Sequence, residues 1–79
     1  MTLRERYNDV LIDRIRSCRY PSKELMDRAE LTLASKQEAE AYGDVLVDKI
    51  TKYPSLQILD RLTGLIYRIE AAERSEASA

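Results

Sequence analysis

Apolar side chains recur every three or four residues along most of this chain, which is the period of an amphipathic helix. Leu3, Tyr7 and Leu11 begin the pattern near the N-terminus, and Tyr42 and Leu46 continue it in the second half. The strict alternation typical of a half-buried strand is absent. The pattern predicts four helices, at about 3–18, 22–33, 36–51 and 55–73.

Two Tyr-Pro-Ser segments, at residues 20–22 and 53–55, interrupt the pattern. Proline disfavours helical geometry at the residue before it, and it suits the first turn of a following helix. The serine after each proline can accept a hydrogen bond from a free amide of that turn. A third break precedes Ser35, which stands three residues before Glu38 and so has capping-box spacing. Each half of the chain is therefore expected to be a helix, a tight turn and a second helix.

The two halves are copies of one another. Residues 7–15 match residues 42–50 at six of nine positions, and residues 19–28 match residues 52–61 at five of ten. The offset falls from 35 to 33 because the first copy has two extra residues before its Tyr-Pro-Ser turn. We predict an all-α single domain over residues 1–79, built from two tandem helix-turn-helix (αα-hairpin) repeats that form a compact four-helix bundle. The repeats span residues 3–33 and 36–73, and a small, polar tail at 75–79 is expected to fray.

The fourth predicted helix has an apolar face about 140° wide, more than one neighbouring hairpin needs. Such a helix either lies at the centre of the bundle or contacts a second chain. A second chain would also help a core that is marginal at this length. The candidate partner-interface residues are Ile58, Leu62, Leu65 and Ile69.

Composition narrows the possible chemistry. The chain has no histidine and one cysteine, so an internal disulfide, a His/Cys metal site and a Ser-His-Asp triad all lack their residues. A glycine-rich phosphate loop is also missing, since there are two glycines in total. We therefore expect no enzyme activity, no metal and no cofactor.

Location is predicted from the same residues. The longest apolar run is three residues, whereas a transmembrane helix needs roughly 20, so no membrane partner is expected. The first residues have no apolar stretch typical of a signal peptide. A lone thiol, Cys18, fits a reducing compartment, and we expect a cytoplasmic protein.

Charge is balanced overall, at a formal net −1, but is unevenly distributed. Residues 1–23 carry six basic and three acidic side chains, and the remainder carries seven basic and eleven acidic. The alternative nucleic-acid contacts are Arg14, Arg16, Arg19 and Lys23. Against this alternative, the second hairpin lacks the basic excess and proline stands where a recognition helix would begin.

The recurring Asp-Arg and Asp-Lys pairs are interpreted as structural. Acid–base chemistry by paired carboxylates is conceivable, but every carboxylate here has a basic neighbour. We expect ion pairs across each hairpin, Asp13 with Arg28 and Asp48 with Arg61. Exposed pairs of this kind are worth roughly 0–1 kcal/mol and mainly set register.

Three further features have structural interpretations. Tyr20 and Tyr53 are expected to pack their rings over the turns with the hydroxyl groups in water, although a repeated recognition corner is the alternative. Arg14 and Lys49, at the edge of the apolar stripe, are expected to extend their charged ends into solvent, although a buried functional cation is the alternative. Cys18 continues the apolar period of the first helix and is expected in the core.

The repeated element Arg/Lys-Tyr-Pro-Ser-x-x-Leu/Ile-Met/Leu-Asp-Arg, at residues 19–28 and 52–61, follows the element Tyr-x-Asp-Val-Leu-x-Asp. This pattern resembles small helical proteins of uncharacterised function encoded by phages of actinobacteria, over about residues 3–70. The resemblance implies a phage accessory protein in the host cytoplasm that binds a host factor. It assigns no functional residue.

Two hypotheses of function follow. The first is a non-enzymatic protein-interaction module that self-associates through its fourth helix. The alternative is a nucleic-acid-binding protein that uses its basic first hairpin.

Overall fold

The structure is a computed structural model that describes residues 1–78, with side chains described for residues 1–75. Four helices follow one another along the chain: α1 (Leu3–Ser17), α2 (Lys23–Leu31), α3 (Lys36–Lys52) and α4 (Leu56–Ser78). The prediction of an all-α four-helix bundle is confirmed. The bundle is flat, with extents of 40 × 29 × 18 Å.

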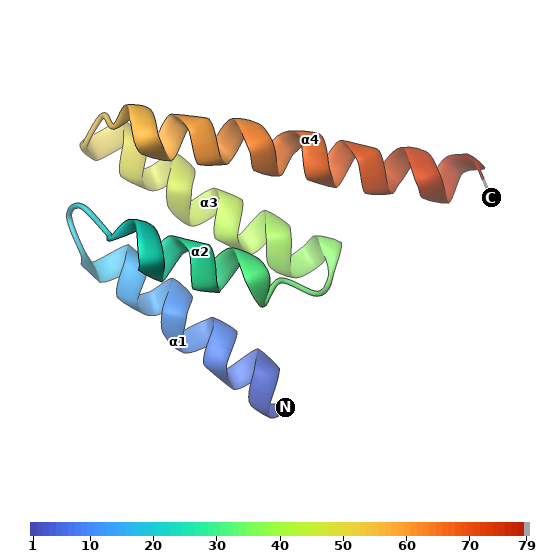
Figure 1. Ribbon diagram of the computed structural model, residues 1–79, viewed down its shortest axis with the longest axis horizontal. Helices are drawn as coiled ribbons and strands as arrows, with labels where there is room; N and C mark the ends of the chain where they lie inside the picture. The colour runs from blue at the N-terminus through green and yellow to red at the C-terminus, as the bar shows by residue number, and fades with distance from the viewer. Residues whose placement is uncertain (79) are drawn as a thin grey trace.

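The helices pack as two antiparallel hairpins, α1 with α2 and α3 with α4 (Figure 1). The hairpins meet mainly where α1 contacts α3, and these two first helices run in the same direction. Both Tyr-Pro-Ser turns therefore lie at one end of the molecule (Figure 1). The two repeats thus stack on one another in the same orientation, as successive repeats do in helical repeat proteins.

Side-chain caps fix the helix starts. The Thr2 hydroxyl accepts the amide of Glu5 at 3.2 Å while the Glu5 carboxylate accepts the amide of Thr2 at 3.1 Å, a full capping box. Ser22 and Ser35 each cap the third residue of their helix at 3.1 Å. Of the capping box predicted at Ser35 and Glu38, the hydroxyl cap is present, but the Glu38 carboxylate accepts the amide of Ala34, at 3.1 Å, in place of that of Ser35.

Two helix ends differ from the expected ones. α2 ends at Leu31 rather than 33, because Thr32 closes the helix with its amide bonded to the carbonyls of Ala29 and Glu30. α4 continues to Ser78, past the expected end at 73 and through most of the tail expected to fray. The added stretch contains neither proline nor glycine to end a helix. Residue 79 of that tail lies outside the described residues.

One hydrophobic core runs through both repeats. Its buried members are Leu11, Ile12, Ile15, Met26, Ala29, Leu33, Ala39, Tyr42, Val45, Leu46, Ile58 and Leu65. The amide of buried Asn8 donates to the carbonyl of Ala29 at 3.1 Å and to the hydroxyl of Thr32 at 2.7 Å, which ties α1 to the end of α2. Gly43 is the equivalent residue in the second repeat. A Cβ there would lie 3.2 Å from Cδ2 of Leu65, so glycine permits the close approach of α4.

Candidate interaction surface

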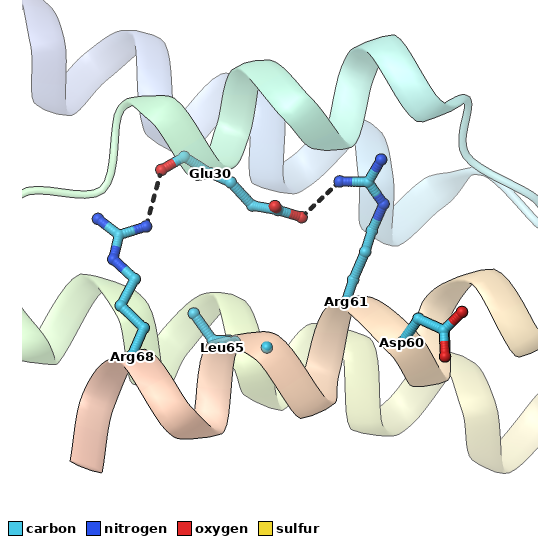
Figure 2. Close-up of a pocket in the computed structure, with 6 residues that line it drawn as sticks. Glu30, Asp60, Arg61, Leu65 and Arg68 are labelled. Carbon is cyan, nitrogen blue, oxygen red and sulfur yellow. Dashed lines mark hydrogen bonds and ion pairs between the residues drawn. The ribbon is translucent and has the colours of Figure 1, made fainter. Parts of the chain in front are cut away.

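An ionic network joins the two repeats. The guanidinium of Arg61 on α4 donates to Asp27 and to Glu30 on α2, both at 2.7 Å. The hydroxyl of Tyr42 on α3 donates to the same Glu30 carboxylate at 2.7 Å. Figure 2 shows Glu30 reaching from α2 between Arg61 and Arg68 of α4. The network therefore fixes how the second hairpin sits on the first.

These contacts correct the ion pairs expected across each hairpin. Arg61 bonds to the other repeat and not to Asp48. Asp48 instead pairs with Lys52 at 3.3 Å, and Asp13 pairs with Arg16 at 3.1 Å. Both aspartates lie on exposed faces, where the nearest basic group is one turn along the same helix.

The network shifts the pKa values of three of its members. Hydrogen bonds from Arg61 and then from Lys23 hold the pKa of the Asp27 carboxyl below its usual range. Burial lowers the pKa of the Arg61 guanidinium, but its hydrogen bonds to Glu30 and Asp27 outweigh burial, and the pKa is raised. Burial and the bond to Glu30 raise the pKa of Tyr42 well above its usual range. All three residues therefore keep their neutral-pH protonation state over a wide interval.

Acid should weaken the network. Because the folded-state pKa of Asp27 is lowered, its stabilising contribution is present above the unfolded-state pKa near 4 and is lost as pH falls through the folded value. We expect the melting temperature, followed by circular dichroism, to fall as the pH drops below about 4. Asp27→Asn should reduce this fall. At a concentration where the protein is monomeric, the matched substitution Asp60→Asn, at the equivalent position of the second repeat, should leave this fall unchanged. An equal effect of both substitutions would contradict the assignment of the acid sensitivity to Asp27.

A cavity of about 290 Å³ lies between α2 and α4, beside the network (Figure 2). It is lined by Glu30, Asp60, Arg61, Gly64, Leu65 and Arg68. Arg68 donates to the backbone carbonyls of Glu30 and Leu33, both at 3.2 Å. Most of the charged groups in this cavity are thus engaged within the chain. Among the residues whose side chains are described, no His, Cys, Asp and Glu cluster could hold a metal ion.

The residues predicted as a partner interface lie against the core instead. Ile58 and Leu65 are buried, and Leu62 and Ile69 are half-buried against the core cluster. The prediction that these four residues are exposed to a partner is therefore corrected: they face the core, because α3 packs on that side of α4. Four other large apolar side chains of α4 remain exposed: Leu56, Leu59, Ile66 and Tyr67. The wide apolar face of the sequence therefore divides into a core side and an exposed side.

The four residues predicted to contact nucleic acid are exposed, and three of them already contact another side chain of the protein. Arg16 pairs with Asp13 and Lys23 pairs with Asp27. The guanidinium of Arg19 lies over the ring of Tyr53, 4.8 Å from its centroid. Arg14 lies on the exposed side of α1. A polar cavity of about 330 Å³ between the two turns is lined by Arg16, Ser17, Arg19, Asp48, Lys49, Lys52 and Tyr53.

Lys49 differs from its expected solvent-exposed arrangement. It is buried, and its ammonium group donates to the backbone carbonyls of Arg16, at 2.6 Å, and of Cys18. The lysine thus satisfies carbonyl groups at the C-terminus of α1, where a positive charge is favourable. Cys18 itself is exposed, which corrects its expected place in the core. It caps α1 in an extended conformation and so leaves the helical face on which the apolar period placed it.

The two turn tyrosines contact one another. The ring centroids of Tyr20 and Tyr53 are 5.9 Å apart and the planes are tilted by 57°. This pairing arises because the hairpins stack in the same orientation, which brings the turns together. It gives the repeated tyrosines a structural role between the repeats.

No protein-family model, curated protein or solved structure matched this chain. No helix within residues 1–78 combines the length and the apolar character needed to cross a membrane.

Proposed function

We propose that this protein is a non-enzymatic protein-interaction module that self-associates through the exposed apolar side of α4. The observation that supports the proposal is the row of exposed large side chains on a helix whose other side already forms the core. Leu56, Leu59, Ile66 and Tyr67 form this row, which we call the outer face of α4. Isolated exposed apolar residues are ordinary on protein surfaces, but a contiguous set marks an interaction site.

Self-association also offsets the small size of the domain. A chain of 79 residues buries a smaller fraction of its surface on folding than a larger domain does, so burial against a second copy would add stability. The basic side chains of the first hairpin support a weaker alternative, nucleic-acid binding. Of its four residues, Arg16, Arg19 and Lys23 already contact a carboxylate or a ring within the chain.

Light scattering over a range of micromolar concentrations tests the proposal. The mass of the wild-type protein should rise with concentration. Ile66→Asp, which places a charge in the outer face of α4, should shift the protein to monomers. The matched substitution Leu31→Asp, on an exposed leucine of α2, should leave association unchanged. A wild-type protein that stays monomeric throughout this range would contradict the proposal.

A further inference from the structure

Equivalent positions of the two repeats differ in burial, and the differences reveal two complementary surfaces. The two hairpins share the matched sequence positions and the same order of helix, turn and helix. We therefore attribute a difference in burial between equivalent positions to an element outside the hairpin. For each repeat, that outside element is the other repeat. Comparison of equivalent positions therefore separates the two sides of the contact between the repeats.

The second repeat buries one side of this contact. Tyr42 is fully buried and Val45 is 5% exposed, whereas the equivalent Tyr7 and Val10 are 43% and 56% exposed. The polar members of the same side, Lys49 and Arg61, bond to the first repeat. Their equivalents Arg14 and Arg28 are exposed. We call the four exposed residues of the first repeat the head face: Tyr7, Val10, Arg14 and Arg28.

The first repeat buries the other side. Ile12 and Met26 are 8% and 0% exposed, whereas the equivalent Val47 and Leu59 are 47% and 41% exposed. Asp27 forms the ion pair with Arg61, and its equivalent in the second repeat, Asp60, is exposed. Ile66 lies two turns beyond Leu59 on the same side of α4 and is also exposed. We call the exposed set on the second repeat the tail face: Val47, Leu59, Asp60 and Ile66.

One ion pair between the repeats has an equivalent pair on the two faces. Arg61 pairs with Asp27 between the repeats, and the equivalent pair is Arg28 of the head face with Asp60 of the tail face. Among the described side chains, neither Arg28 nor Asp60 forms a salt bridge. One position departs from the pattern, because Thr63 stands where the first repeat has Glu30. The second contact would therefore have one carboxylate for its arginine rather than two.

We propose that the head face of one copy docks on the tail face of another, in the arrangement that the second repeat adopts on the first within the chain. This proposal rests on the proposed self-association and specifies its partner surface. Terminal repeats of soluble helical repeat proteins carry polar side chains on the surface that no further repeat covers. Here the head face and the tail face both keep apolar side chains on that surface. A head-to-tail contact leaves one face free at each end, so copies add until a ring closes or continue as an open array.

Two variants that each block one face test this arrangement. Val10→Asp blocks the head face and Leu59→Asp blocks the tail face, both at exposed positions. Sedimentation equilibrium should find each variant monomeric at a concentration where the wild-type protein associates. An equimolar mixture should form a one-to-one dimer that grows no further, because one intact head then meets one intact tail. Circular dichroism should show wild-type helicity in both variants.

Other outcomes are distinguishable. If the wild-type protein is monomeric, the proposed self-association itself fails. If it associates while Val10→Asp associates equally well, or if the mixture of folded variants stays monomeric, only the head-to-tail arrangement is overturned. A symmetric contact between two α4 helices predicts the former result, because it does not use α1.

A charge exchange tests the polar register of the contact. Arg28→Asp should weaken association about tenfold, because it places two carboxylates opposite one another. Asp60→Arg should weaken it similarly, and the double variant should recover most of the wild-type affinity. Failure of the double variant to recover would contradict the pairing of these two residues.

Discussion

Replacing Leu46 with alanine is expected to lower the free energy of unfolding by about 3 kcal/mol. Leu46 is fully buried at the centre of α3 and belongs to the core shared by both repeats. Its truncation removes apolar contacts and leaves a cavity that the neighbouring helices can fill only in part. A domain of this length has a total stability of about 4–12 kcal/mol, so the loss is a large fraction of it.

Urea denaturation followed by circular dichroism measures this loss as a lower midpoint at unchanged slope. Leu31→Ala is the matched control, since this leucine of α2 is 83% exposed and the same atoms are removed. It should change stability by less than about 0.5 kcal/mol. Equal effects of the two substitutions would show that Leu46 does not occupy the core.

Replacing Arg61 with methionine is expected to destabilise the protein by about 2 kcal/mol. Only 12% of the Arg61 side chain is exposed, and it bonds two carboxylates of the other repeat. Its removal leaves Asp27 and Glu30 without their shared cation. Both acids remain partly exposed and recover some hydration, so the expected loss is smaller than for a fully buried pair.

The equivalent arginine of the first repeat supplies the control. Arg28→Met removes the same groups from an exposed position that has no salt bridge among the described residues. Measured by urea denaturation at concentrations where the protein is monomeric, it should change stability by less than about 0.5 kcal/mol. A loss as large as that of Arg61→Met would mean that the contact between the repeats does not explain the effect.

The elements of the fold follow from local sequence signals. The three- or four-residue period, the prolines and the serine caps act within one or two turns, so they indicate helices and turns without knowledge of the tertiary structure. The internal repeat then indicates two hairpins. The end of α2 was harder to predict, because Thr32 closes the helix through bonds of its own backbone and hydroxyl group.

The contacts between the repeats could not be derived in this way. Lys49 and Arg14 are equivalent in sequence, yet one is buried against the carbonyls of α1 and the other is exposed. Arg61 and Arg28 differ in the same manner. The members of each pair differ because the other hairpin packs against one side of each repeat and leaves the other side exposed. The sequence of a single repeat does not indicate which side the other hairpin covers.

The candidate interface illustrates the same limit. The width of the apolar face on the fourth helix was visible in the sequence, but its division was not. Ile58 and Leu65 enter the core, while Leu59 and Ile66, each one residue further on, stay exposed. A rotation of the helix by about 100° would exchange the two sets. Packing against α3 and the bonds of Arg61 and Arg68 to the first repeat fix that rotation.

The hairpin arrangement also bears on how the chain reaches its native state. α1 with α2 and α3 with α4 are neighbours in sequence as well as in space, and the turns between them are short. Closing such short loops costs little chain entropy, so each hairpin can form before the two halves meet. Because the main contacts between its helices are local in sequence, we expect this chain to fold at the rate of helical domains of low contact order, within microseconds to milliseconds.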